Sequence, residues 1–265
     1  MDLLSLSFAG VTPHEYKMLT SHGHMGVGDR IREKVSRAGR MDRGRLTGLL
    51  KAKGIDHITL DDAEYPTLLK EIYDPPFVLY YRGDVNLLEK PMLGIVGSRK
   101  ATGYTRIVLQ RIVPDLEGMV VVSGLAYGAD DMAHNTAMEN GLGTVGVLAF
   151  GHDLHYPRST GRTRERMEQE GLVISEYPPD VKIAKWRFVA RNRIIAGLSS
   201  GVLVTEAELA SGSLITLDMA LNENRHTYCI PGNIHAPQSA GTNEKLREGA
   251  KMVLSARDIM EDFRS

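Results

Sequence analysis

The chain has 265 residues, of which 42% are hydrophobic and 25% charged, with a formal net charge of −1 at pH 7. This length allows one large domain and a small one, and no apolar run is long enough to span a bilayer. A single cysteine, Cys229, excludes an internal disulfide framework and a cysteine-rich zinc site.

The first 60 residues are predicted to be helical. Thr12-Pro13 is a typical helix start, and the chain begins with MDLLSLSFAG, which lacks the basic region of a signal peptide. The basic stretches that follow are compatible with DNA contact or with a solvated surface. We therefore expect a cytoplasmic protein with a small helical domain over residues 1–60, of the SAM or helix-hairpin-helix kind, and a second domain over residues 61–265.

From about residue 90, short apolar runs alternate with helical stretches. This alternation is typical of a parallel sheet that is covered on both faces. We predict a doubly wound α/β domain with a mainly parallel sheet. The predicted strands are residues 92–96, 119–123, 144–150, 172–175, 201–205 and 226–230, with a short strand before them in FVLYY.

Glycines, hydroxyl residues and arginines follow five of these strands. In open parallel sheets, ligands bind outside the carboxyl ends of the strands, so we expect the five ends to converge on one cleft. Small residues with outward amides and arginines make a phosphate-binding surface. Neither GxGxxG nor GxxxxGK[ST] occurs, which argues against an NAD site and an ATPase P-loop. The five ends are Gly97-Ser98-Arg99, Ser123–Asp130, Gly151-His152, Glu206–Ser213 and Pro231-Gly232-Asn233.

Two basic runs are candidates for phosphate contact, at residues 158–166 and 182–193. Arg191 and Arg193 are two residues apart and cannot share one helix face, so one is expected to face the cleft and the other to pair within the protein. Trp186 lies beside the second run. An aromatic residue among arginines is typical of a groove for single-stranded nucleic acid, although core packing fits Trp186 as well.

The carboxylates and histidines do not form a recognisable catalytic or metal site. Glu206 and Asp130 can each act as a base or hold a helix N-terminus, and capping is favoured for Asp130. No nucleophile or second carboxylate stands in register with them. His152 and His155 are only an i, i+3 pair and lack metal-ligand spacing. We assign no catalytic residue, no metal and no cofactor.

Five motifs together resemble the DNA-processing protein A family, also called Smf. The resemblance implies a Rossmann-like core that binds and protects incoming single-stranded DNA, forms a homodimer and loads the RecA recombinase during natural transformation. Single-strand-binding protein is a further partner compatible with this role. The motifs are YPTLLKEIYDPPFVLYYRGD, GIVGSRKATGYTR, VVSGLAYGADDMAH, RNRIIAGLSSGVLVTEAELASGSLIT and IPGNIHAPQSAGTN.

The resemblance also implies which residues bind DNA. Arg99 corresponds to the phosphate-contacting arginine of the family's VGSR turn. Val189 and Asn224 stand where the family usually has proline and glycine, and asparagine can still adopt the left-handed conformation. Many members carry a C-terminal winged helix, which we do not expect here. The implied DNA-binding residues are Ser98, Arg99, Ser123, Gly124, Arg158, Arg191, Asn192 and Arg193.

Two functions remain open at this point. The favoured one is a non-enzymatic single-stranded DNA-binding protein whose arginines and amides follow the phosphates. The alternative is a nucleotide-binding or nucleoside monophosphate-hydrolysing enzyme that uses the same cleft, with Glu206 or Asp130 as the catalytic carboxylate. A homodimer surface is expected within residues 213–224 or 234–250.

Overall fold

The computed structural model describes residues 2–23 and 26–263. Its N-terminal part is helical, as predicted. In Thr12, Oγ1 accepts a hydrogen bond from the Glu15 amide at 3.2 Å, and the Glu15 carboxylate accepts one from the Thr12 amide at 2.8 Å. This reciprocal capping confirms the helix start at Pro13. The four helices are α1 (Leu3–Phe8), α2 (Pro13–His22), α3 (Asp29–Ala38) and α4 (Arg43–Ala52).

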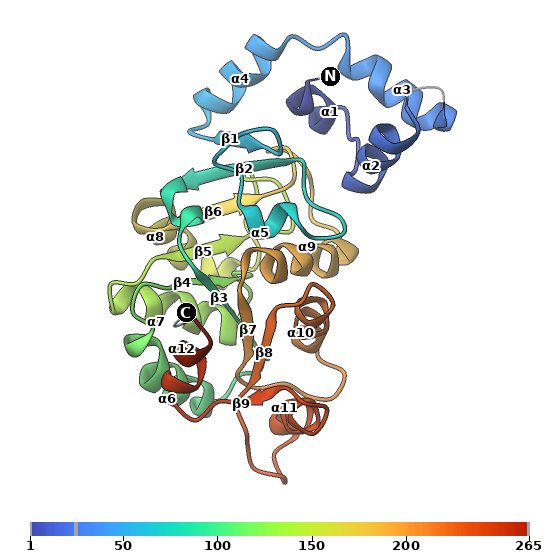
Figure 1. The fold of residues 1–265 in the computed structure, drawn as a ribbon. Coiled ribbons are helices and arrows are strands. Elements are labelled where there is room, and N and C mark those ends of the chain that lie inside the picture. The colour runs from blue at the N-terminus through green and yellow to red at the C-terminus, as the bar shows by residue number, and fades with distance from the viewer. Residues whose placement is uncertain (1, 24–25, 264–265) are drawn as a thin grey trace.

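A nine-stranded sheet forms the rest of the molecule's framework (Figure 1). Its order is β1-β2-β6-β5-β4-β3-β7-β8-β9, in which the pairs β1–β2 and β2–β6 are antiparallel and the others are parallel. The mainly parallel α/β fold is therefore confirmed. The strands are β1 (Asp56–Thr59), β2 (Val78–Gly83), β3 (Met92–Val96), β4 (Val120–Ser123), β5 (Thr144–Val147), β6 (Leu172–Ser175), β7 (Gly201–Val204), β8 (His226–Cys229) and β9 (Lys251–Met252).

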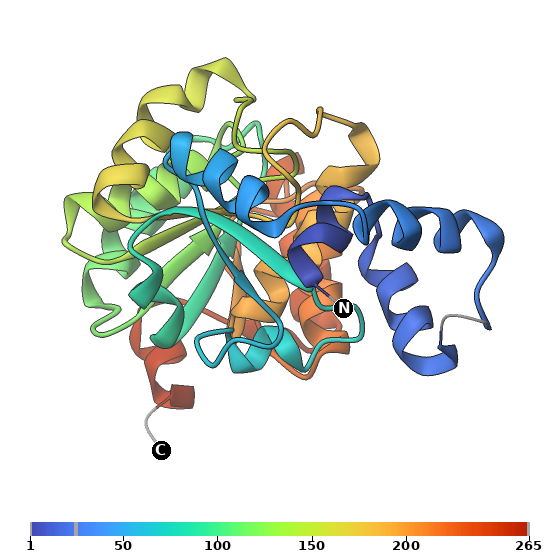
Figure 2. The same ribbon diagram turned by 90° about the horizontal axis from the view of Figure 1, so that it is seen from above.

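Helices cover both faces of the sheet, as Figures 1 and 2 show. The fully buried strands alternate their side chains between two cores: Val122 packs on the side of α9 and α10, and Val121 on the side of α6 and α7. This arrangement is the predicted double winding. The helices are α5 (Thr67–Lys70), α6 (Gly103–Ile112), α7 (Ala129–Glu139), α8 (Gly161–Glu170), α9 (Lys185–Leu198), α10 (Gly212–Asn222), α11 (Pro237–Arg247) and α12 (Arg257–Met260).

The helical N-terminal part is packed directly against one end of the sheet. Its apolar cluster includes Phe77, Val78 and Tyr80 of the β2 region, and the Tyr80 hydroxyl donates to the Ser7 hydroxyl at 2.8 Å. Strand β1 lies within the first 60 residues, yet it pairs with β2 as part of the sheet. After α10, Asn224 has a φ of 57°, so asparagine takes the left-handed conformation as expected.

Candidate functional site

A cleft of about 420 Å³ lies at the carboxyl ends of β3, β4 and β7, alongside α9. We call it the strand-end cleft. Three of the five predicted strand ends therefore meet in one place. Its lining consists of residues 96–100 after β3, Ala126 and Asp130 after β4, Glu208 and residues 210–213 with Thr216 after β7, and Phe188, Val189, Arg191, Asn192 and Ile195 of α9.

A smaller hollow of about 70 Å³ adjoins the cleft at the end of β5. We call it the aromatic hollow. The Phe188 ring lies 5.8 Å from that of Tyr156 and 6.4 Å from that of Phe150. Residues 148–150 line it because β5 ends at Val147, three residues earlier than predicted. An apolar, partly enclosed space of this kind suits a flat ring, such as an unstacked base.

Arg99 lines both the strand-end cleft and the aromatic hollow. Its side chain is exposed and forms no ion pair with any residue that the structure describes. The guanidinium carbon lies 5.8 Å from the centre of the Phe188 ring. Lys100, which sequence reasoning did not single out, is also exposed and lines the cleft. Two exposed cations therefore line the strand-end cleft, and one of them, Arg99, also lines the aromatic hollow.

Hydrogen bonds and close packing against Gly128 fix the conformation of the turn that carries Arg99. The Ser98 amide donates to the Glu206 carbonyl at 2.7 Å, and the Ser98 hydroxyl accepts from the Lys100 amide at 3.0 Å. Gly128 has a φ of 91°, and a Cβ there would lie 2.5 Å from the Ser98 carbonyl oxygen. Only glycine permits this approach. Ser98 is buried, so its role is to position Arg99, and its hydroxyl is not offered to a ligand in the cleft.

Arg191 forms the floor of the cleft. It is buried, and its Nη1 donates to the Val147 carbonyl at 2.6 Å. Burial lowers the pKa of Arg191 to about 10, which still leaves it charged at neutral pH. Burial also raises the pKa of Asp130, against the opposing effect of Arg191. A Cβ at Gly124 would overlap the Arg191 guanidinium, so this glycine makes room for the charge.

Gly124 lines the aromatic hollow and Ser123 is buried and lines neither space, and the donors of both already have partners. The Ser123 hydroxyl donates to the Ile95 carbonyl at 2.6 Å, and the Gly124 amide donates to the Asp130 carboxylate at 3.2 Å. Asp130 thus ties down the β4–α7 loop, whereas the N-cap of α7 is Gly128. The helix-capping role expected for Asp130 is therefore corrected.

The remaining predicted site residues lie in different places. Asn192 lines the cleft, and its amide nitrogen lies 3.4 Å from the Gly212 carbonyl. Arg193 faces away and binds Glu176 at 2.9 and 2.6 Å, so it is the arginine that pairs within the protein. Arg158 is exposed beside the aromatic hollow but lines neither hollow.

Glu206 is occupied in holding the N-terminus of α6. Its carboxylate accepts the Thr102 amide at 2.7 Å and the hydroxyls of Thr102 and Thr105 at 2.8 and 2.7 Å. It opens onto a third hollow, lined by Pro231–Asn233 at the end of β8. The expectation of one common cleft is thus wrong for β8, because Glu206 and α6 stand between that strand end and Arg99.

We expect Glu206→Gln to lower the free energy of unfolding by about 1–3 kcal/mol, since the amide can accept fewer of these hydrogen bonds and loses the charge at the helix N-terminus. Urea unfolding would measure the loss. Glu208→Gln, which changes an exposed carboxylate on the same loop, is the matched control. Unchanged stability would show that the Glu206 carboxylate is available for another role.

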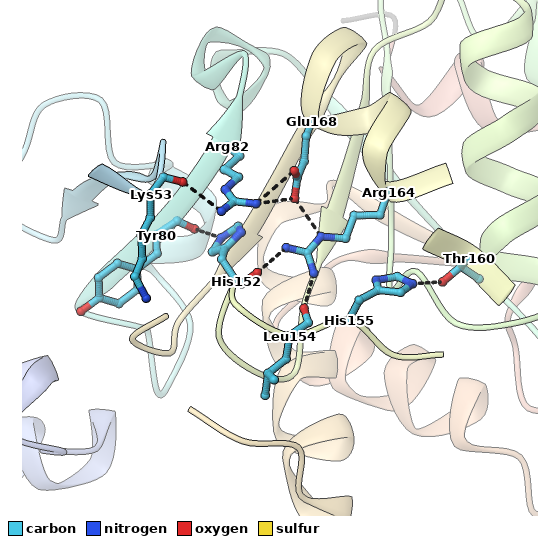
Figure 3. A network of polar contacts seen from close by, with 9 residues as sticks. All are labelled: Lys53, Tyr80, Arg82, His152, Leu154, His155, Thr160, Arg164 and Glu168. Atoms are coloured by element: carbon cyan, nitrogen blue, oxygen red, sulfur yellow. Dashed lines mark hydrogen bonds and ion pairs between the residues drawn. The ribbon is translucent and has the colours of Figure 1, made fainter. Parts of the chain in front are cut away.

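The first basic run does not form a continuous basic surface. Figure 3 shows that Arg164 reaches the carbonyls of His152 and Leu154, while Arg164 and Arg82 meet at the Glu168 carboxylate. Arg82 also donates to the Lys53 carbonyl at 2.9 Å. The network joins α8, β2 and the end of α4, so Arg164 serves the structure.

His152, in this network, is expected to make stability depend on pH. Burial lowers the pKa of His152 to about 4 from 6.5. The unfolded chain therefore binds a proton between these values when the folded chain does not, and stability falls as pH falls through that interval. From pH 7 to pH 5 we expect a loss of about 2 kcal/mol from this residue.

Urea unfolding at several pH values would test this, with His152→Gln expected to reduce the dependence by that amount, while the buried His134, whose pKa is lowered to about 3, still contributes its own share. His14→Gln, on the exposed side of α2, provides the control. An identical pH dependence in His152→Gln and the unmodified chain would contradict the assignment.

Among the described residues, no group of three or more histidine, cysteine, aspartate or glutamate side chains could hold a metal ion.

Cys229 is buried in β8, as expected for a core residue. Trp186, in contrast, is 60% exposed, which excludes core packing, one of the two alternatives left open for it. Within the same part of the chain, no helix has the length and apolar character needed to cross a membrane.

The fold and the cleft define a class of protein: a Rossmann-like α/β protein with a cleft at the carboxyl ends of its parallel strands, where ligands of such folds bind. The model of the family described as DNA recombination-mediator protein A matches residues 56–264. This chain belongs to that family. The predicted resemblance to DNA-processing protein A is thereby confirmed.

Curated relatives agree with this assignment. The chain is 40% identical over 222 residues to DNA processing protein DprA of Bacillus subtilis, covering 83% of this chain and 75% of the relative. It is 43% identical over 205 residues to DNA processing protein DprA of Streptococcus pneumoniae, covering 77% and 72% respectively.

Solved structures extend the likeness to the whole chain. The X-ray structure of DNA processing protein A from Streptococcus pneumoniae has a TM-score of 0.90 at 33% identity, covering 99% of this chain and 98% of that one. DNA processing protein A from Helicobacter pylori, whose structure concerns its single-stranded DNA binding mode, has a TM-score of 0.71 at 30% identity over 78% of this chain and 95% of its own.

Proposed function

We propose that this chain binds single-stranded DNA in the strand-end cleft. Arg99 carries the proposal, because its exposed guanidinium stands without an acidic partner among the described residues and faces two hollows of different character. One hollow holds groups that suit a phosphate, namely Lys100 and the N-terminus of α10. The other is aromatic and suits an unstacked base.

The Helicobacter pylori relative supports this proposal, since single-stranded DNA is the ligand that its structure concerns. Phosphate contacts of this kind bind with little regard to sequence, and a base on the Phe188 ring is held by its flat face. Asn192 contributes a polar group on the same wall of the cleft. Arg191 contributes buried positive charge beneath it.

Binding without hydrolysis fits these residues better than an enzyme does. The two carboxylates that a hydrolase would need are engaged: Glu206 with the N-terminus of α6, and Asp130 with the Gly124 amide beside Arg191. Neither stands ready to take a proton from an attacking water in the cleft. We therefore propose a non-enzymatic role.

The wider role that we propose follows from the family. The protein would act in the cytoplasm, protect incoming single-stranded DNA during natural transformation and load RecA onto it, with single-strand-binding protein as a further partner. It would do so as a homodimer, because two clefts on one strand raise the effective affinity. The helix α10 exposes Ile215 and Leu221, which makes it the surface we favour for such contacts.

Fluorescence anisotropy with a labelled oligo-dT strand and a matched duplex, at several salt concentrations, tests the central proposal. We expect the single strand to bind more tightly than the duplex and its affinity to fall as salt rises. Equal affinity for both, or none for either, would contradict single-stranded DNA as the ligand.

A further inference from the structure

A second groove lies on the other side of α9 from the strand-end cleft, between that helix and the N-terminal helices. It has a volume of about 620 Å³. We call it the interdomain groove. The helix α9 presents Phe188, Val189 and Asn192 to the cleft, and Trp186, Arg187 and Ala190 to the groove. The two spaces therefore flank the same helix, beginning within its first turn.

Trp186 is the outstanding feature of the groove. It is 60% exposed, although indole is among the side chains that gain most from burial. The guanidinium carbon of Arg187 lies 5.1 Å from the Trp186 ring and 5.0 Å from the Tyr177 ring, and Arg187 also donates to the Lys182 carbonyl. A flat aromatic surface thus stands directly beside a fixed cation.

The charges of the groove favour an anionic occupant. Two of its three acidic residues, Glu176 and Asp74, are engaged by Arg193, with the closest ion-pair distances at 2.6 and 3.5 Å, and the third, Asp180, is exposed. Arg30 lies on the opposite wall, is exposed and has no ion-pair partner among residues 2–23 and 26–263. In the described part of the chain, two cations of the groove without ion-pair partners, Arg30 of α3 and Arg187 of α9, therefore stand against one such carboxylate, Asp180.

We propose that the interdomain groove continues the path of the DNA strand: a strand that leaves the strand-end cleft past Phe188 stacks a base on Trp186 and passes its phosphates between Arg187 and Arg30. A nucleotide can bind to an aromatic ring and a cation that lie side by side, because its base stacks on the ring and its phosphate pairs with the cation. The proposal gives the N-terminal helices a role as the far wall of the binding path. It rests on the proposed function, because it requires single-stranded DNA in the cleft.

The chain provides its own probe, since Trp186 is its one tryptophan. The experiment titrates the full-length chain with oligo-dT strands of increasing length and records tryptophan emission and the anisotropy of the labelled strand together. We expect strands above a threshold length to quench the emission, with the same midpoint as binding. Shorter strands, which occupy the cleft alone, are expected to bind without quenching.

Substitutions then test the contacts. Trp186→Ala is expected to weaken binding of the longer strands about 5- to 100-fold and to leave the shorter ones unchanged, whereas Trp186→Phe retains most of the affinity. Arg30→Glu is expected to act on the longer strands alone. Ile107→Ala, at a side chain that is 64% exposed on α6, is the matched control and should change neither.

Emission that stays constant while long strands bind would overturn the proposal and assign the groove to another partner. A Trp186→Ala variant that loses affinity for short and long strands alike would also overturn it, since Trp186 would then act at the cleft. If the unmodified chain bound no strand of any length, the proposed function itself would fail. The anisotropy record separates that outcome from the first two.

Discussion

Arg99→Ala is expected to weaken binding of oligo-dT by about tenfold or more at moderate salt, because a charged hydrogen bond to phosphate is lost. The slope of the logarithm of affinity against the logarithm of salt concentration should decrease in magnitude by about one, as expected for one lost phosphate contact. The fold should be unaffected, since the Arg99 side chain is exposed and engages no acidic residue in the described part of the chain. Fluorescence anisotropy over a salt series measures both quantities.

Arg106→Ala is the control for this measurement. It removes the same charge from an exposed position on α6, away from both hollows. Arg99→Lys adds a second comparison, because it keeps the charge and loses the forked geometry that grips a phosphate. If Arg99→Ala and Arg106→Ala behaved alike, the strand-end cleft would not be where the phosphates bind.

Arg193→Met is expected to lower the free energy of unfolding by about 3–5 kcal/mol, the usual effect of breaking a buried ion pair from one side. The Glu176 side chain is only 4% exposed and would lose the guanidinium that it binds. Arg193 also donates to the Asp74 carbonyl at 3.0 Å, so a second buried acceptor would be left unpaired. Urea unfolding measures this loss.

The double variant Arg193→Met with Glu176→Gln should recover part of the stability, because no unpaired charge remains. At temperatures where Arg193→Met stays folded, its affinity for oligo-dT strands too short to reach the interdomain groove should equal that of the unmodified chain. Weakened binding at unchanged stability would be the opposite result, and it would place Arg193 in the DNA-binding surface.

Most of the fold could be predicted because it depends on local patterns. Apolar runs of four to seven residues identified β3 to β8 but not the two-residue parallel strand β9, and the strand at 172–175 agrees in both bounds with β6. The strand predicted over 144–150 is too long because residues 148–150 are as apolar as the strand itself. They are buried because they pack with Leu125, Met138, Met167 and Val173, a tertiary contact that composition alone does not reveal.

The site was predictable in position but less so in the role of each residue. The strand ends indicated Arg99, and the two-residue spacing indicated that Arg191 and Arg193 face apart. Which of the two pairs internally depends on Glu176, which is distant in sequence and reaches Arg193 only in the folded sheet. Likewise, the hydroxyl of Ser123 donates a hydrogen bond to the Ile95 carbonyl on a neighbouring strand. This contact depends on the order of the strands in the sheet.

The pairing of β1 with β2 has a practical consequence for anyone who shortens this chain. A fragment that starts at residue 61 would lack β1 and would leave the hydrogen-bonding groups of β2 open along one side. It would also uncover Tyr80, which is fully buried here. An exposed strand edge beside apolar surface invites aggregation, so truncation studies of the N-terminal helices should keep residues 56–59 with the sheet.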